Sequence, residues 1–372
     1  MKHIALITWL GSGNYGTCLQ SFALNAQLKK LGYDVSFVEI TPFKFKSQIR
    51  LVLEFGITML KTIVTKICNP KPAVDLQTSK RIKFQQKYFK ILSINTKAQL
   101  KQLIGNTDCF ISGSDQIWNT YVAFNPRFFL DFAENKKRVS YASSIGTNDV
   151  KAEYREAVKH LLMKYSHIGV REKTAEKELS KLTGRNDIKQ VLDPTFLLTP
   201  EDWQEMSMSA EFETEIPQNY ILCYLIGNNT HYINQLATIQ NAFDNKNIII
   251  IPAEENRNFS FKGAFVYKNA SPIEFVKLLQ NADLVCTDSF HATALSINHS
   301  VPFVEFMRFN SDDKQSQNSR IYDLLNHYGL MDRIYNENNW SWTDKINYND
   351  VQVILSADRK YSLDYLVNAI EN

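Results

Sequence analysis

The residues best suited to chemistry lie in a short polar segment between two apolar runs in the second half of the chain. The apolar run at 284–286 predicts a buried strand, and Asp288 and Ser289 follow it as residue types that cap helices. His291 then falls in the first turn of the next predicted helix, where free N–H groups and a partial positive charge favour an anion. An imidazole there is able to contact a phosphate or carboxylate and to transfer a proton, although a single histidine also fits an ordinary capped helix.

Two further polar segments follow predicted strands in the first half of the chain. Ser114, Asp115 and Gln116 come soon after the apolar run at 109–112, and small or capping residues at the carboxyl end of a strand indicate a ligand-facing loop. Arg171 lies at a similar strand-to-helix edge, where a lone arginine is more often solvated or paired in a salt bridge. These positions are therefore candidate site residues that each have an ordinary structural alternative.

Three glycines after the first predicted strand raise a rival interpretation. Gly11, Gly13 and Gly16 fit the dinucleotide-binding pattern, and Glu39 lies near the end of the second predicted strand, where a ribose-binding acid would lie. Any tight turn that faces a ligand between a strand and a helix also uses glycine. Spacing alone leaves both interpretations open, and the helix is expected to begin after this loop, at Thr17.

Strands and helices alternate along the whole chain, which predicts an α/β fold of two domains with a cleft between them. The expected limits are 1–198 for the first domain, with an inserted helix at 47–70, and 199–350 for the second. A C-terminal helix at 351–372 is expected to pack back on the first domain. The 372 residues are ample for two hydrophobic cores.

The composition is that of an ordinary globular protein, with 44% hydrophobic and 22% charged residues. The 42 Lys and Arg against 39 Asp and Glu give a net charge of +3, which offers no support for a nucleic-acid partner. The seven His and five Cys show no zinc-site spacing, and Cys109, Cys223 and Cys286 lie in apolar runs typical of reduced core residues. The first residues carry no signal-peptide cleavage site, so we expect a cytoplasmic protein.

The segment 49–68 is long and apolar but is interrupted by four charged residues, too many for a membrane span. On a helix its polar residues form one stripe opposite a broad apolar face, which suits an interfacial helix that docks on an anionic membrane. More often such a helix packs against its own domain. A peripheral contact of this segment with the inner face of the plasma membrane is therefore an expectation with a structural alternative.

Six short motifs stand out along the chain in a fixed order. They are NYGT at 14–17, GSDQIWN at 113–119, SYASSIG at 140–146, VRE at 170–172, LDPT at 192–195 and TDSFHATAL at 287–295. Together they resemble the polysaccharide pyruvyl transferase family over most of the chain. The resemblance implies two Rossmann-like domains in a GT-B-like arrangement, and transfer of the pyruvyl group of phosphoenolpyruvate to a sugar, giving a cyclic ketal and free phosphate. The family's turn at NYG binds no dinucleotide, so the resemblance argues against that interpretation of the glycines.

The resemblance also implies roles for particular residues around the donor. Arg171 and His291 would surround it, with His291 the first choice for contacting phosphate or moving a proton. Asp115 and Asp288 are candidate bases or acceptors of a sugar hydroxyl. Asp193 is expected only to cap the crossover between the domains.

One departure from the family pattern concerns the charge at the donor site. Several relatives carry Arg-Leu before the histidine, whereas this chain has Ser289 and Phe290, which are themselves candidate donor-binding residues. We expect Arg320, at the start of another predicted helix, to supply the missing guanidinium for the donor. The acceptor-binding candidates are Asn14, Tyr15, Gly16, Ser114 and Gln116.

The expected partners are phosphoenolpyruvate as co-substrate and a galactose-like sugar on a lipid-linked capsular or exopolysaccharide precursor. No cofactor, metal or nucleic acid is expected. Two other classes of function stay open. One is a sugar-nucleotide glycosyltransferase, since the same two-domain fold serves that chemistry. The other is a non-catalytic glycan-binding scaffold of a capsule assembly system, which the departure at Ser289 keeps open.

Overall fold

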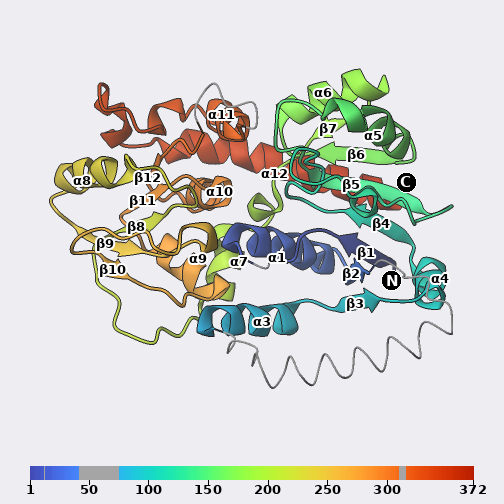
Figure 1. The fold of residues 1–372 in the computed structure, drawn as a ribbon, viewed down its shortest axis with the longest axis horizontal. Helices are drawn as coiled ribbons and strands as arrows, with labels where there is room; N and C mark the ends of the chain where they lie inside the picture. The colour runs from blue at the N-terminus through green and yellow to red at the C-terminus, as the bar shows by residue number, and fades with distance from the viewer. Residues whose placement is uncertain (12, 42–74, 310–315) are drawn as a thin grey trace, which may run out of the picture.

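The chain folds into two lobes, each built on one β-sheet with helices packed around it (Figure 1). The structure is a computed structural model that describes residues 1–11, 13–41, 75–309 and 316–372. Within these ranges the strands of both sheets pair in parallel. Parallel pairing is what alternating strands and helices require, because each crossover carries a helix.

The first domain contains a seven-stranded sheet in the order β3-β2-β1-β4-β5-β6-β7. The chain winds outward from β1 first to one side and then to the other, as in a Rossmann fold. Its strands are β1 (His3–Ile7), β2 (Asp34–Ile40), β3 (Ile91–Ile94), β4 (Cys109–Ser112), β5 (Lys137–Ser143), β6 (His167–Val170) and β7 (Lys189–Gln190). The winding reverses between β1 and β4, and ligands bind such sheets at that point.

The second domain repeats this winding with five strands in the order β10-β9-β8-β11-β12. They are β8 (Tyr220–Tyr224), β9 (Asn247–Ile250), β10 (Phe265–Val266), β11 (Leu284–Thr287) and β12 (Phe303–Glu305). Strands β8 and β11 are buried along their whole length, which explains their continuous apolar sequence. The reversal here lies between β8 and β11.

Several helices begin at a residue whose side chain caps them, whereas α10 begins after Ser289 without a hydrogen bond from that side chain. Asn14 accepts a hydrogen bond from the N–H of Gly16 at 2.8 Å, and Ser271 and Glu274 form a capping box. In the first domain the helices are α1 (Tyr15–Lys30), α3 (Leu76–Tyr88), α4 (Lys97–Asn106), α5 (Arg155–Leu162) and α6 (Lys173–Thr183). After the crossover they are α7 (Pro200–Ser207), α8 (Tyr232–Ala242), α9 (Pro272–Gln280), α10 (Phe290–His299), α11 (Asn318–His327) and α12 (Tyr348–Glu371).

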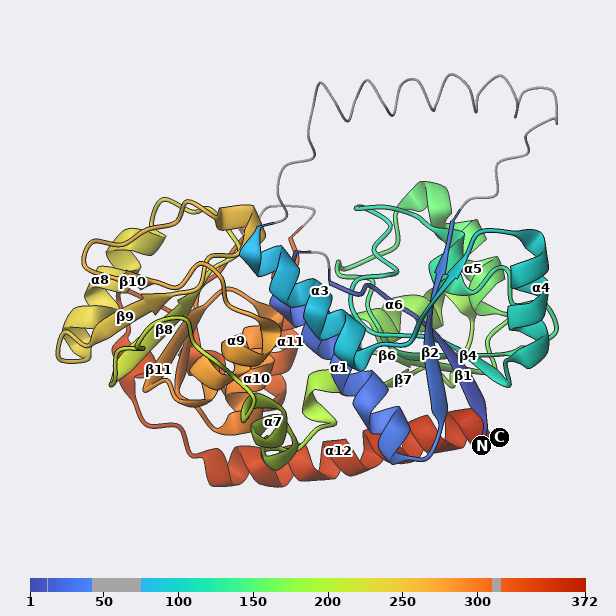
Figure 2. The same cartoon turned by 90° about the horizontal axis from the view of Figure 1, so that it is seen from below.

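Helix α1 joins the two domains, since one hydrophobic cluster runs from its buried side into the second domain. The ring of Tyr15 stacks on Phe275 of α9, with centroids 4.7 Å apart, and its hydroxyl donates to the carbonyl of Ala270 at 2.8 Å. Burial of each such side chain contributes about 1.5–3 kcal/mol. Figure 2 shows α1 and α3 between the two lobes.

Helix α12 runs along both domains (Figure 2). Near its start, Gln352 donates to the carbonyl of Ile297 in α10 at 3.1 Å. Near its end, the hydroxyl of Tyr365 donates to the carbonyl of Ser140 in β5 at 3.1 Å. One helix therefore bonds to a helix of the second domain and to a strand of the first.

These elements confirm the predicted fold class, two Rossmann-like domains in a GT-B-like arrangement with a cleft between them. The predicted core positions of Cys109, Cys223 and Cys286 are also confirmed, because all three are buried free thiols. Three elements, β3, α4 and β7, were not predicted. Helix α1 begins at Tyr15 rather than Thr17, since Asn14 caps it, so Gly16 lies in the helix and not in a loop.

The inserted helix predicted at 47–70, with its membrane-contact segment 49–68, lies outside the described residues. In the part of the chain that the structure describes, no helix has both the length and the apolar character needed to cross a bilayer.

Candidate active site in the interdomain cleft

A cavity of about 430 Å³ lies between the domains, where the loops after β1 and β4 face those after β8 and β11. The strand order reverses once in each sheet, and both of these points therefore face the same cavity, as expected for a ligand site of this fold. The first domain contributes Trp9, Asn14, Thr17, Asp115 and Gln116 to its wall, and the second contributes Glu254, Ser289, Phe290, His291, Arg308, Gln317 and Arg320.

His291 lies in the first turn of α10, as predicted, and its ring is held between the two domains. Its Nε2 lies 3.5 Å from Oδ2 of Asp193 and 3.5 Å from Nη1 of Arg171. On the opposite side, a Cβ added to Gly16 would lie only 2.3 Å from Nδ1 of the ring. Glycine is therefore required at position 16 because His291 occupies the space of any side chain there.

Asp193 was expected only to cap the interdomain crossover, and the structure shows that it does more. Its Oδ1 accepts from the N–H and the hydroxyl of Thr195 at 2.9 and 2.8 Å, which caps the short helix η3 (Pro194–Phe196). Its Oδ2 accepts from Nη1 of Arg171 at 3.0 Å and from the hydroxyl of Ser114 at 3.1 Å, and also faces His291. Burial alone would raise the pKa of Asp193, but His291 and Arg171 lower it well below its usual range. Asp193 is thus an ionised partner for the imidazole.

Arg171 lies behind this pair rather than on the cavity wall, and its side chain is 1% exposed. Its Nε donates to Oε1 of Glu172 at 2.8 Å, and its guanidinium lies 4.3 Å from the centroid of the Phe290 ring. Three carboxylates form ion pairs with it, Glu172 at 2.8 Å, Asp193 at 3.0 Å and Asp115 at 3.8 Å. The charge of Arg171 is therefore compensated by the protein itself.

Arg320 does line the cavity, in the first turn of α11, and its surroundings differ from those of Arg171. It donates to the side-chain oxygen of Gln317 at 2.8 Å, and the side-chain amide of Gln116, which also bonds to Gln317 at 2.9 Å, lies beside it. Among the described residues no carboxylate pairs with it. Burial, and then repulsion from Arg171, lower the pKa of Arg320 to about 9. A buried cation that only neutral groups contact is suited to bind an anion.

Asp115 also lines the cavity and is held in a strained backbone conformation, with φ at 73°. Its Oδ2 accepts from the hydroxyl of Thr17 at 2.7 Å, and its Oδ1 accepts from the N–H of Gln116 at 2.9 Å. Burial would raise the pKa of Asp115, but His291, Arg171 and the bond from Thr17 lower it below its usual value. Its carboxylate is ionised and stands in the cavity wall.

The structure does not bring the carboxylate of Asp288 into the cavity. Its oxygens accept from the N–H groups of Ile226 and Gly227, both at 2.7 Å, and from the hydroxyl of Tyr232 at 2.9 Å. Nε of Arg308 lies 3.3 Å away, which fixes that arginine at the cavity wall. Asp288 therefore ties the loop after β8 to the loop after β11, and Arg308 is a site residue that the sequence did not reveal.

The predicted acceptor residues separate into two groups. Asn14 and Gln116 line the cavity, whereas Tyr15, Gly16 and Ser114 do not. Tyr15 is a core residue, Gly16 lies beneath His291, and Ser114 donates to Asp193. These three residues lie outside the cavity wall and support the residues that form it.

The glycine loop after β1 packs against the second domain. A Cβ on Gly13 would lie 1.9 Å from Oε2 of Glu254, which belongs to the short helix η4 (Glu254–Asn256), and one on Gly16 would meet His291. Gly11 has a φ of 82°, which favours glycine. Glu254 and His291 therefore occupy the space directly above Gly13 and Gly16, while Gly11 and Gly13 still border the cavity.

Among the residues that the structure describes, no group of three or more His, Cys, Asp or Glu side chains is arranged to hold a metal ion.

Comparison with known proteins gives one match to a family. The model described as polysaccharide pyruvyl transferase matches residues 14–307. A search of curated proteins finds no significant match.

Several solved structures are similar at low identity. UDP-GlcNAc 2-epimerase from Neisseria meningitidis, bound to UDP-GlcNAc, is 10% identical over 99% of this chain and 100% of its own, with a TM-score of 0.47. MnaA of S. aureus with UDP is 10% identical over 97% of each chain, with a TM-score of 0.49. MurG from Acinetobacter baumannii is 11% identical over 100% of this chain and 99% of its own, with a TM-score of 0.46.

Proposed function

Because this chain belongs to the polysaccharide pyruvyl transferase family, we propose that it moves the pyruvyl group of phosphoenolpyruvate onto two hydroxyls of one sugar residue. The products would be a cyclic pyruvate ketal and free phosphate. The observation that carries this proposal is Arg320, a buried cation without a carboxylate partner among the described residues, in the same cavity as His291. Phosphoenolpyruvate, which carries its carboxylate and its phosphate on the same carbon, would supply the missing negative charge.

Three features of the cavity suit this donor. Arg320 and Arg308 offer guanidinium N–H groups, which grip carboxylate or phosphate oxygens in pairs. The first turn of α10, from Phe290, adds the positive end of a ten-residue helix. Ser289 leaves room where relatives carry arginine, so we assign to Arg320 the charge that position 289 lacks.

The chemistry requires that protons be moved and that charge be stabilised. Carbon 3 of the donor gains a proton, carbon 2 bonds to one sugar oxygen, and a second sugar oxygen then displaces phosphate from carbon 2. The two hydroxyl protons leave the sugar, which balances the proton on carbon 3 and one on phosphate. We assign proton transfer to His291, oriented by Asp193, and removal of a hydroxyl proton to Asp115.

We propose a galactose-like residue of a lipid-linked capsular or exopolysaccharide precursor as the acceptor, with the reaction at the cytoplasmic side of the membrane. Asn14 and Gln116 on the cavity wall carry amides suited to sugar hydroxyls.

The test is ligand-induced thermal stabilisation, compared between wild type, Arg320→Gln and His291→Gln, with the surface variant Arg257→Gln as control. A ligand at a hundred times its Kd adds about 2.7 kcal/mol to the folded state. We expect phosphoenolpyruvate to stabilise wild type and Arg257→Gln, and to lose at least tenfold in affinity for Arg320→Gln.

Two results would overturn the proposal. Stabilisation by nucleotide sugars and not by phosphoenolpyruvate would make the protein a glycosyltransferase. Binding of a glycan with no response to phosphoenolpyruvate, alone or with sugar, would make it a glycan-binding scaffold.

A further inference from the structure

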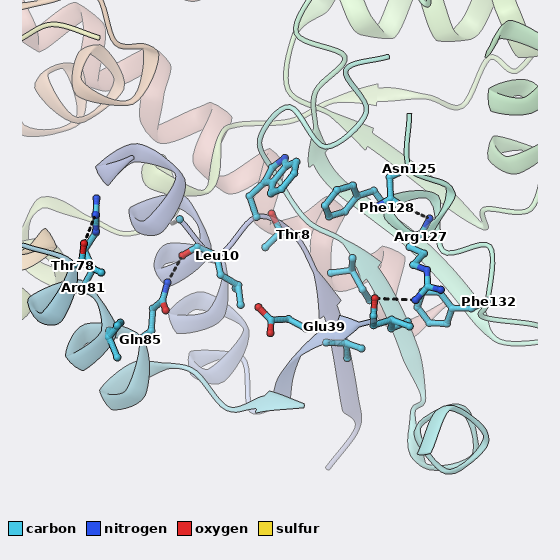
Figure 3. A pocket seen from close by; sticks show the side chains of 16 residues that line it. Thr8, Leu10, Glu39, Thr78, Arg81, Gln85, Asn125, Arg127, Phe128 and Phe132 are labelled. Atoms are coloured by element: carbon cyan, nitrogen blue, oxygen red, sulfur yellow. Dashed lines mark hydrogen bonds between the residues drawn. The ribbon is translucent and has the colours of Figure 1, made fainter. Parts of the chain in front are cut away.

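A second cavity, of about 500 Å³, lies in the first domain beside the candidate active site (Figure 3). It sits at the carboxyl ends of β1 and β2, between α3 and the short helix η1 (Pro126–Phe129). Trp9 and Gly11 line both cavities. A ligand that extends out of the active site over Trp9 would enter this second space.

Glu39, close to the end of β2, supplies the cavity with an unpaired carboxylate. Its side chain is exposed, and in the described part of the chain no side chain forms an ion pair or hydrogen bond with it. Figure 3 shows the carboxylate directed toward Leu10 and Gln85 and away from Arg127. An ionised carboxylate is an acceptor for two or more hydroxyl donors.

Trp9 supplies a fixed aromatic surface between the cavities. Its carbonyl accepts from the hydroxyl of Ser21 at 2.6 Å, and its ring lies 4.8 Å from that of Phe128. The side chain nevertheless remains 43% exposed. A large apolar face left open beside polar groups suits a ring that is apolar on one face and hydroxylated at its edge.

The other polar groups of the wall are mostly engaged by backbone carbonyls. Nη1 of Arg127 donates to Ile40 at 2.9 Å, and the amide of Gln85 donates to Leu10 at 2.8 Å (Figure 3). Arg81 is the exception, since its side chain is 3% exposed and its Nη1 lacks a hydrogen-bond acceptor among the described residues. Arg81 is otherwise engaged, since its Nη2 donates to the hydroxyl of Thr78 at 3.3 Å and its Nη1 lies 3.8 Å from Oε2 of Glu254. Among the described residues the cavity thus has one free acceptor, the carboxylate of Glu39.

We propose that this cavity binds the sugar residue next to the one that receives the pyruvyl group, with Glu39 accepting its hydroxyls and Trp9 contacting its apolar face. This inference rests on the proposed function for the identity of the glycan. The two arginines of the wall are already engaged, Arg81 by Glu254 and Arg127 by the carbonyl of Ile40, whereas the carboxylate of Glu39 is free and disfavours an anion. A neutral sugar therefore fits better than the phosphate of a lipid carrier. Glu39 also occupies the place of a ribose-binding acid, which makes a nucleoside the rival occupant.

The test uses direct binding, so that it does not depend on turnover. Calorimetry would compare lactose, maltose and N,N′-diacetylchitobiose, each with the methyl glycoside of its non-reducing sugar, and AMP as the nucleoside probe. The proteins are wild type, Glu39→Gln and the control Glu134→Gln, which changes an exposed glutamate of the same domain that lines neither cavity. Glu39→Gln keeps the shape of a side chain that has no partner among the described residues, so its folding is expected to be unchanged.

We expect at least one disaccharide to bind wild type and Glu134→Gln at least tenfold more tightly than its methyl glycoside. Glu39→Gln should remove this advantage, with the thermal response to phosphoenolpyruvate unchanged. Disaccharides that bind no better than methyl glycosides, an advantage retained in Glu39→Gln, or binding of AMP that Glu39→Gln abolishes would each overturn the inference. Lack of a response to phosphoenolpyruvate in wild type would instead count against the proposed function, while the sugar comparison still decides the role of Glu39.

Discussion

The ring of His291 occupies the space that a side chain at Gly16 would need, with its Nδ1 2.3 Å from the position of a Cβ. The two residues belong to different domains, so this contact sets the distance between α1 and α10 at the centre of the cleft. The effect of this contact on catalysis can be tested by a substitution at position 16, which changes no polar group.

We predict that Gly16→Ala displaces His291. The variant should lose about 1–3 kcal/mol of unfolding free energy through overpacking and at least tenfold in phosphate release. Gly105→Ala in α4 is the control, because a Cβ there meets no atom within 4 Å. That change should be neutral or stabilising by about 0.5–1 kcal/mol. Equal behaviour of the two variants would contradict the prediction.

We predict that Arg320→Gln is more stable than wild type in the absence of ligand. The pKa of Arg320 is lowered to about 9 when folded, against about 12.5 or more when unfolded, so the penalty of its buried charge is fully present below pH 9. The advantage of the variant should therefore shrink as the pH rises above 9, measured by urea unfolding at pH 7 and 10.

Arg308→Gln is the comparison for this effect. It leaves the buried Asp288 without its ion-pair partner and should be less stable than wild type at pH 7. If Arg320→Gln is less stable than wild type, Gln116 and Gln317 must compensate the buried charge of Arg320 in the wild-type protein.

We predict that Asp193→Asn loses about 3–5 kcal/mol at pH 7, because the buried Arg171 loses a carboxylate partner. The pKa of Asp193 is below its usual range in the folded state, so its stabilising effect is fully present above about pH 3.9 and is lost as the pH falls through the folded pKa. Urea unfolding at pH 7 and pH 3 should give a smaller difference from wild type at the lower pH. A difference that grows on acidification would exclude this assignment.

We predict that Glu305→Gln is tolerated and becomes progressively more stable than wild type from pH 5 to pH 8. Glu305 is buried at the end of β12, accepts from the hydroxyl of Thr293, and its Oε1 has no partner among the described residues. Burial raises its pKa to about 8, so the unfolded chain releases this proton first and the folded state loses stability as the pH rises toward 8. Thermal unfolding at each pH measures the difference in stability between Glu305→Gln and wild type. A difference that does not change with pH would mean that Glu305 is ionised throughout.

We predict that Tyr15→Phe lowers stability by about 1 kcal/mol and leaves the KM for the acceptor unchanged. Its hydroxyl donates to Ala270 and accepts from Gln77 at 2.7 Å, both away from the cavity. Thermal unfolding and acceptor kinetics separate the two effects. A raised KM for the acceptor with unchanged stability would instead indicate that Tyr15 contacts the acceptor.

Local patterns in the sequence were enough to find most of the fold. The strand and helix around His291 follow from residues that are neighbours in the chain, as do the buried strands β4, β8 and β11. The predicted capping was wrong, because neither Ser289 nor Asp288 caps α10 with its side chain. The elements that the sequence did not reveal are short or exposed. Strand β7 has two residues and β3 is largely exposed, so neither carries a continuous apolar run.

The candidate site was predicted only in part, for a physical reason. Strand ends place Asp115 and His291 at the cleft, because parallel strands end at one edge. Arg320 was predicted from its place at the start of a helix. The contacts of Asp193 with His291, and of Gly16 with the same ring, join residues far apart in sequence and leave no local signal. Capping propensity suggested Asp288 correctly as a loop residue, but only tertiary contacts show that its carboxylate is turned away from the cavity.

The unbroken 24-residue helix α12, bonded to α10 at one end and to β5 at the other, has a mechanical consequence. A rod attached to both lobes resists their sliding along its length, because sliding would break hydrogen bonds at either end. Twisting about its axis disturbs these bonds far less. Helices α12 and α1, which both join the two domains, thus favour rotation of one lobe against the other over sliding of the lobes along α12.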